Sequence, residues 1–181
     1  PATDPVSLYA ATKRSGELMS QSYAKLYGFP MTGLRFFTVY GPWGRPDMAY
    51  FGFTKKILAG ESIEVYGQGR MARDFTYIDD IVDGILGALD HPPERHGHRI
   101  LNIGDSRPVG LMDMIKALEE ALGIEAEKIM RPMQPGDVTS TYADVSKLHA
   151  LTGYAPKVML EDGLKKFVSW YRGFYGNLPP A

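Results

Sequence analysis

The amino-acid sequence predicts an α/β fold in which part of a parallel sheet is followed by a smaller mixed α/β unit. A segment suited to a helix over 7–27 is followed at once by a nearly continuous apolar run over 31–39. Such a run is typical of a strand that is covered on both faces. After residue 40 the expected elements are short, mixed in type and separated by Gly and Pro, as in a compact α/β unit. Residues 1–40 therefore resemble sheet-forming material without its partner strands.

The composition is that of an ordinary globular protein. The 181 residues are 44% hydrophobic and 23% charged, with a net charge of −1, so no basic surface argues for nucleic acid. No apolar run approaches the ~18–20 residues of a membrane span, and the absence of cysteine excludes thiolate chemistry. The four histidines lack a metal-ligand pattern, and three of them lie in one polar loop. We expect a cytoplasmic protein with no metal, nucleic-acid or membrane partner.

The first helix is expected to begin at Asp4 and Pro5, a capping residue followed by a residue suited to a first turn. Gly28 and Pro30 are expected to end it. The strand over 31–39 then leads into a loop rich in Gly and Pro. In open α/β sheets, ligands bind just past the carboxyl end of such a strand.

The remaining elements follow from apolar spacing and from Gly and Pro. We expect helices over 48–59, 80–89, 111–122, 144–151 and 160–175, and strands over 63–66, 73–77, 99–103 and 128–131. Asp79 is expected to cap the helix over 80–89. The helices over 111–122 and 160–175 carry apolar residues at spacings of three and four, which predicts one buried face on each.

A tyrosine and a lysine stand four residues apart in the first helix. Tyr9 and Lys13 therefore share one helical face, one turn apart. A nearby ammonium group stabilises the phenolate and lowers the pKa of the phenol, which brings it closer to the working range of a general base. Taken alone the spacing is weak evidence, since a half-buried tyrosine beside an exposed lysine is common.

Two arginines suit an anionic ligand. Arg73 lies in an extended segment after a glycine turn, and a guanidinium matches phosphate or carboxylate through paired N–H groups. The alternative for Arg73 is a salt bridge to Asp74 or Asp79. Arg45 lies in the loop past the first strand, and its alternative is an ordinary surface position.

Four segments together resemble the extended short-chain dehydrogenase/reductase superfamily, specifically its NAD-dependent nucleotide-sugar epimerases. They are Y-x-x-x-K at 9–13, LRFFTVYGP at 34–42, RMARDFTYIDD at 70–80, and QPGDV at 134–138 followed by AD at 143–144. Within that group, GRPDMA at 44–49 is most similar to the UDP-glucuronate 4-epimerases.

The resemblance implies the carboxyl-terminal part of a Rossmann-type parallel sheet, with the catalytic helix and the following strand, plus a small mixed α/β substrate-binding domain. Residues 1–40 would be a remnant of the dinucleotide-binding domain. Residues 41–181 would be the nucleotide-sugar-binding domain, with some segments returning to the sheet.

The resemblance also implies a reaction and a set of site residues. The complete protein would invert C4 of a UDP-hexose, UDP-glucuronate or UDP-galacturonate, by transient oxidation to a 4-keto sugar with NAD as cofactor. Tyr9 would take the proton of the 4-hydroxyl, and Lys13 would bind the nicotinamide ribose. The implied cofactor-binding residues are Tyr9, Lys13, Phe36 and Val39. The implied substrate-binding residues are Thr38, Arg45, Met48, Ala49, Tyr66, Arg73, Gln134 and Asp137.

Three of these residues have specific implied roles. Tyr66 would pack on uracil, Arg73 would clamp the diphosphate, and Arg45 would pair with the glucuronate carboxylate. A glucose epimerase has no need of a cation at the last position.

The sequence departs from the family pattern: some relatives have Arg where Gln134 stands, and the Ser/Thr expected beside Tyr9 is not found. It contains no G-x-x-G-x-x-G loop for the pyrophosphate of a dinucleotide, so this chain alone is expected to be inactive. Two alternatives stay open, a nucleotide-sugar 4,6-dehydratase and a non-catalytic module that binds UDP-sugars or dimerises. The resemblance further suggests a homodimer through the Tyr9 helix and a role in polysaccharide biosynthesis.

Overall fold

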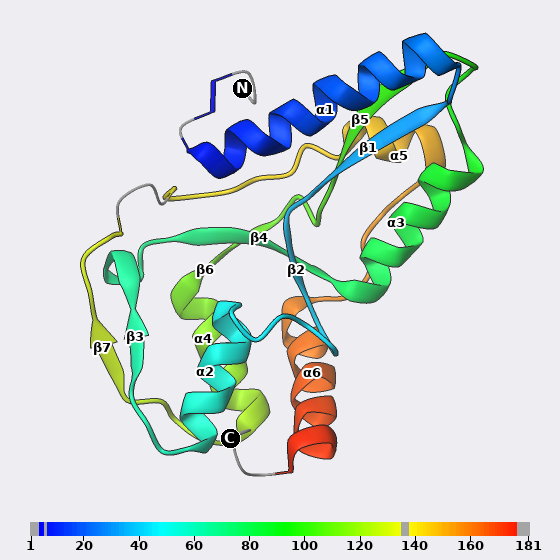
Figure 1. Cartoon of the computed structure of the whole chain (residues 1–181). Helices are drawn as coiled ribbons and strands as arrows, with labels where there is room; N and C mark the ends of the chain where they lie inside the picture. Colours follow the sequence, from blue (N-terminus) through cyan, green and yellow to red (C-terminus); the bar gives the residue numbers. More distant parts are fainter. Residues whose placement is uncertain (1–3, 6, 135–137, 177–181) are drawn as a thin grey trace.

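The computed structural model describes residues 4–5, 7–134 and 138–176, and its elements follow one another as helices and strands of mixed length (Figure 1). In chain order they are α1 (Leu8–Tyr27), β1 (Met31–Phe36), β2 (Thr38–Tyr40), α2 (Ala49–Leu58), β3 (Ile63–Val65), the 3-10 turn Tyr66–Gly69, β4 (Ala72–Tyr77), α3 (Ile78–Asp90), β5 (His98–Ile103), β6 (Pro108–Gly110), α4 (Leu111–Leu122), β7 (Lys128–Met130), α5 (Ser146–Thr152) and α6 (Leu160–Tyr175).

Most strand pairs are parallel, which confirms the predicted α/β class. β1 pairs with β5 from Met31↔His98 to Phe36↔Ile103, β2 pairs with β4, and β3 pairs with β7. The exception is β6, which runs antiparallel to β4. In Figure 1, β2 and β4 run between an upper group that contains α1, β1, β5 and α3 and a lower group that contains α2, α4 and α6.

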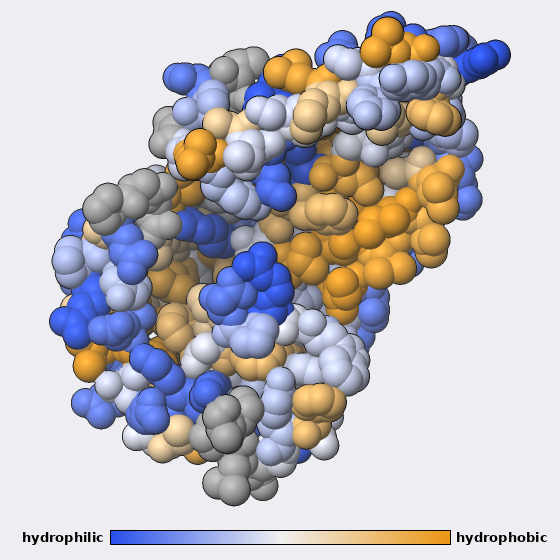
Figure 2. Space-filling view, viewed as in Figure 1, coloured by the Kyte–Doolittle hydropathy of each residue, from blue (hydrophilic) through white to orange (hydrophobic). Residues whose placement is uncertain are grey.

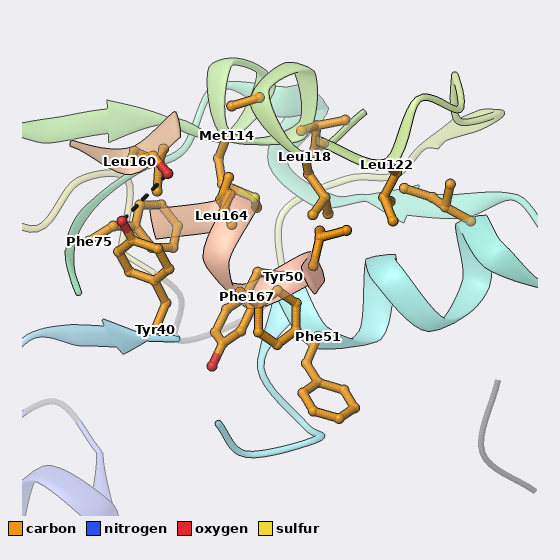
Figure 3. Close-up of a cluster of buried hydrophobic side chains, with 14 of the residues drawn as sticks. Tyr40, Tyr50, Phe51, Phe75, Met114, Leu118, Leu122, Leu160, Leu164 and Phe167 are labelled. Carbon is orange, nitrogen blue, oxygen red and sulfur yellow. Dashed lines mark hydrogen bonds between the residues drawn. The ribbon is translucent and has the colours of Figure 1, made fainter. Parts of the chain in front are cut away.

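Two separate clusters of buried side chains support these groups. The smaller cluster joins α3, β5 and α5 through Ile81, Leu101, Ile103 and Leu148. The larger cluster lies among α2, α4, α6 and the β2–β4 pair, and Figure 3 shows its aromatic centre. The rings of Tyr50 and Phe167 meet edge to face with centroids 4.8 Å apart, a geometry that adds ~0.5–1.5 kcal/mol beyond the burial of the rings.

Several element bounds agree closely with the sequence prediction. The predicted bounds of α4 and α6 are those of the structure. Gly28 ends α1 in the left-handed conformation (φ 76°), and its N–H donates to the Ala24 carbonyl. The predicted span 7–27 agrees with α1, but its cap differs, because the Ser7 hydroxyl accepts from the Ala10 N–H at 3.1 Å. The prediction that Asp4 caps this helix was therefore wrong.

The predicted strand over 31–39 was wrong in two respects. It is divided into β1 and β2 at Phe37, where the chain leaves β5 for β4 after the Phe37 N–H donates to the Ile103 carbonyl. β1 is also half-buried or exposed along its length, because β5 is its one neighbour among the described strands. The expected burial on both faces is therefore not observed.

Two further details were not predicted. α3 begins at Ile78, and Asp79 and Asp80 lie in its first turn, so Asp79 is not the cap. The short strand β6 was not predicted at all, because its three residues are defined by pairing with β4 and have no pattern of their own.

One surface of the molecule leaves many apolar side chains in contact with solvent. On α3, Val82, Leu86 and Leu89 are 44%, 51% and 70% exposed, and Phe36 at the end of β1 is half exposed. Figure 2 shows apolar side chains gathered over the region of β1 and α3. Exposed apolar patches are typical of surfaces that contact another protein segment. Among the described helices, none has the length and apolar character that crossing a membrane requires.

Candidate functional site

The catalytic pair predicted from the sequence lies on the exposed face of α1. The Lys13 Nζ lies 5.2 Å from the centroid of the Tyr9 ring, and the Tyr9 side chain is 71% exposed. Both residues line a cavity of about 460 Å³ between α1 and β1, which we call the helix cavity. Phe36 also lines it. The spacing of four residues therefore places the phenol and the ammonium group on one cavity wall.

A network of charges fixes this helix against β1. Glu17, one turn after Lys13, accepts two hydrogen bonds from the Arg35 guanidinium, at 2.6 Å to Oε1 and 2.8 Å to Oε2. Arg14 donates a third, at 2.8 Å. The Arg35 hydrogen bond is the main cause that lowers the pKa of Glu17 from 4.5 to about 2, although partial burial opposes it. The ion pair between Glu17 and Arg35 thus joins the helix that carries Tyr9 to β1. This ion pair was not predicted from the sequence.

The loop past β2 forms the next part of the site. A cavity of about 380 Å³, the central cavity, is lined by Tyr9, Phe36, Val39, the loop 40–45, Met48 and Tyr50. The backbone of the loop is tightly packed, since a Cβ on Gly44 would lie 1.8 Å from the Tyr50 hydroxyl oxygen. Trp43 adopts a positive φ of 62°, and its ring packs against Trp170 and Phe174 of α6.

Arg45 lies at the edge of the central cavity and has a partner within the loop. Its Nε and Nη2 donate to the two carboxylate oxygens of Asp47, at 3.0 Å and 2.5 Å. The Arg45 side chain is 75% exposed. Arg45 is therefore a solvent-facing cation that lines the central cavity and is paired with a neighbouring acid.

A third cavity, of about 470 Å³, collects most of the predicted substrate-binding residues, and we call it the distal cavity. Its lining includes Thr38, Met48, Ala49, Tyr66, Arg73 and Gln134. The Arg73 Nη1 donates to the carbonyls of Ala72 and Val138, at 3.0 Å and 2.8 Å. These residues come from β2, α2, the turn after β3, β4 and the segment after β7, so only the fold brings them together.

The three cavities share walls and follow one another. Tyr9 and Phe36 line both the helix and the central cavity, and Met48 and Tyr50 line both the central and the distal cavity. Every predicted site residue in the described part of the chain lines at least one of them, while Asp137 lies outside the described residues. Sequence reasoning missed Tyr50 and Glu64. Tyr50 had a signal, because it directly follows Met48 and Ala49.

Asp74, the next residue after Arg73, supports the fold. Asp74 is fully buried, and its carboxylate accepts backbone N–H groups from Asp105 at 2.7 Å, from Ser106 at 2.9 Å and from Ala143 at 2.9 Å. Successive residues of a strand point to opposite faces, so Asp74 is directed away from the face that carries Arg73. Asp74 therefore joins the segments around residues 105 and 143 to β4.

Asp80 serves a similar purpose at the start of α3. It is 3% exposed and accepts the N–H groups of Lys157 and Val158, both at 3.0 Å. Asp80 therefore joins the start of α3 to the segment just before α6. No group of three acidic or histidine side chains suited to a metal occurs among the described residues.

Comparison with known proteins gives the family. Residues 1–104 match the NAD dependent epimerase/dehydratase family. The chain is 55% identical to an uncharacterized 37.6 kDa protein of Escherichia coli O111:H-, over 94% of this chain and 56% of that protein. It is 51% identical to UDP-glucuronate 4-epimerase 5 of Arabidopsis thaliana, over 94% of this chain and 42% of that enzyme.

Solved structures agree. The structure of UDP-glucuronic acid 4-epimerase from Bacillus cereus, in complex with UDP-glucuronic acid and NAD, superposes with a TM-score of 0.88 at 38% identity. The superposition covers 95% of this chain and 55% of that chain, so this chain spans about half the length of the relatives it matches. Because the family match covers more than half of its residues, the chain belongs to the NAD dependent epimerase/dehydratase family.

Proposed function

We propose that the protein containing this chain is an NAD-dependent UDP-sugar 4-epimerase that interconverts UDP-glucuronate and UDP-galacturonate. The observation that carries the proposal is the row of three cavities, which leads from the Tyr9–Lys13 pair to the Arg73 guanidinium. A nucleotide-sugar needs such an arrangement, since its reacting sugar and its base lie at opposite ends of one extended molecule, with the diphosphate between them. Relatives named UDP-glucuronate 4-epimerase support this substrate.

The residues of the helix and central cavities fit a nicotinamide ring and its ribose. Phe36 and Val39 offer an apolar wall, and Lys13 offers a donor beside it. When bound, NAD would supply the acceptor for the C4 hydride and, as its reduced form, the hydride that returns to the other face of C4. The 181 residues contain no G-x-x-G-x-x-G loop, so they hold only part of a dinucleotide site. Accordingly, we propose residues 1–40 as part of the dinucleotide-binding domain and 41–181 as the nucleotide-sugar-binding domain.

The chemistry that we assign to this chain is proton transfer. Tyr9 Oη takes the proton of the sugar 4-hydroxyl, and the Lys13 ammonium group stabilises the phenolate and the negative charge that develops. The ion pair of Glu17 with Arg35 holds α1 in place during this step. After the 4-keto sugar turns in the site, Tyr9 returns the proton to the same oxygen.

The other site residues bind the substrate. We assign the diphosphate to Arg73 with Gln134, the nucleotide to Met48, Ala49 and Tyr66, and a sugar or phosphate oxygen to Thr38. Asp137 belongs to the same proposal, on the resemblance alone. Arg45 pairs with the glucuronate carboxylate by leaving Asp47 for the ligand. The free-energy cost of breaking the Arg45–Asp47 pair is small, because both side chains are exposed to solvent.

NMR of the full-length protein with UDP-glucuronate tests the proposal. UDP-galacturonate should form, and Tyr9→Phe should abolish its formation while leaving UDP binding nearly intact. Tyr27→Phe, on an exposed tyrosine at the end of the same helix, should retain full activity. Conversion of UDP-glucose but not of UDP-glucuronate would contradict the proposed contact between Arg45 and the substrate carboxylate. A 4-keto-6-deoxy product would indicate a dehydratase. Full activity of Tyr9→Phe would show that Tyr9 is not the base.

We also propose that the protein pairs with a second copy through α1. Leu18, Met19, Tyr23 and Leu26 of this helix are between 49% and 73% exposed, and apolar helix faces of this kind are buried in bundles between subunits. Light scattering should give a dimer for the full-length protein and a monomer for Leu26→Glu. A monomeric wild-type protein would refute the pairing.

A further inference from the structure

We infer that Glu64 and Arg131 are positioning residues that hold the Tyr66 ring in the distal cavity, and so set the affinity for the flat base of a nucleotide. The inference rests on the proposed function, in which Tyr66 contacts the base. It adds two residues to which neither the sequence motifs nor the resemblance gives a role.

The three side chains form one chain of charged hydrogen bonds. The Tyr66 hydroxyl donates to Glu64 Oε2 at 3.2 Å. Arg131 binds the other oxygen of the same carboxylate, with Nε at 3.0 Å and Nη2 at 2.8 Å from Oε1. Each oxygen of Glu64 therefore has its own donor. Arg131 is the main cause that lowers the pKa of Glu64, and the Tyr66 hydroxyl acts in the same direction.

The backbone explains why these side chains meet. In β3, Ile63 and Val65 are fully buried, so Glu64 between them points to the opposite, cavity-lining face. Arg131 directly follows β7, the partner of β3, and its N–H donates to the Val65 carbonyl at 2.9 Å. The Arg131 carbonyl in turn accepts the Gln68 N–H at 3.1 Å. The turn that carries Tyr66 is thus fastened to Arg131 on both sides.

A fixed ring is a better platform for a base than a mobile one. A tyrosine ring that is ordered before binding loses less conformational entropy when the ligand arrives, so the stacking energy contributes more fully to affinity. Hydrogen bonds to charged groups are stronger than neutral ones, so a carboxylate held by Arg131 is suited to fixing the phenol. Tyr66 begins a turn that contains two left-handed residues, Gly67 and Gln68.

A double-mutant cycle on the full-length protein tests the inference, with UDP as the probe and calorimetry as the measurement. Glu64→Gln and Tyr66→Phe should each raise the Kd for UDP about 3- to 10-fold, the effect expected from loss of one charge-assisted hydrogen bond. The two effects should be less than multiplicative in the double variant, because both substitutions weaken the same contact. Asp162→Asn, which removes the exposed pair with Lys165 on α6, is the matched control and should leave the Kd unchanged.

The outcomes separate this inference from the proposed function. Coupled effects with an unchanged melting temperature support a positioning role, because a loss of fold stability would not depend on the Tyr66 hydroxyl. If the two effects multiply, or if Glu64→Gln binds UDP like the wild type, the inference is overturned while the proposed function stands. If the wild-type protein does not bind UDP, both are overturned.

Discussion

Replacing Glu17 by Gln should destabilise the protein by weakening the joint between α1 and β1. The Glu17 side chain is 16% exposed and holds Arg35 through two short hydrogen bonds. Its pKa is lowered from 4.5 to about 2, which at ~1.36 kcal/mol per pH unit sets a ceiling of about 3.4 kcal/mol at neutral pH. Because the Arg35 side chain is 36% exposed, solvent screening should reduce the measured loss to about 1.5–2 kcal/mol.

The same pair predicts a pH dependence with a definite sign. A carboxyl group with a depressed pKa in the folded state contributes its full stability above its unfolded pKa, near 4.5, and loses it as the pH falls toward 2. The difference between wild type and Glu17→Gln should therefore shrink within this window. Urea unfolding followed by circular dichroism at pH 7, 5 and 3.5 measures it, with Glu120→Gln, at an exposed position of α4, as control. A difference below ~0.5 kcal/mol at pH 7, or one that does not change with pH, would refute the reasoning.

Three further predictions follow from the cavities. Arg73→Ala should weaken UDP binding by ~2–3 kcal/mol, as for a charge-assisted contact. Calorimetry measures this change, and an unaltered Kd would mean that the diphosphate binds elsewhere. Arg45→Ala should raise the KM for UDP-glucuronate at least ~5-fold and leave the weak binding of UDP-glucose unchanged, and equal effects in steady-state kinetics would count against a carboxylate contact. Gly44→Ala should lower the thermal midpoint, because its Cβ would lie 1.8 Å from the buried Tyr50 hydroxyl, whereas Gly52→Ala, with open space at the Cβ, should raise it or leave it unchanged.

Local patterns predicted those parts of the fold whose causes are local. The bounds of α4 and α6 follow from an apolar stripe with the helical period, and the end of α1 follows from Gly28. Where two local signals competed, the sequence could not decide between them. Asp4 and Ser7 are both good capping residues, and the choice of Ser7 depends on where the helix begins against β1 and β5.

Tertiary pairing accounts for the other errors. Residues 31–39 read as one strand, but the change of partner from β5 to β4 at Phe37 divides it. β6 exists because β4 offers a free edge to residues 108–110. The candidate site was predicted in part from the sequence. Its residues were assigned from motifs that resemble a family, and no periodicity places residues of β2, α2 and β4 in one cavity.

The segment 73–80 explains why that motif carries information on both fold and site. Alternation along β4 directs Arg73 to the distal cavity and Asp74 to the opposite side. There the Asp74 carboxylate accepts three backbone N–H groups from segments about 30 and 70 residues further along the chain. Asp80 accepts two more, just before α6. The acidic residues of this motif thus hold β4 in place from the side opposite the distal cavity. A guanidinium on a strand held in this way can bind a phosphate with little loss of conformational entropy.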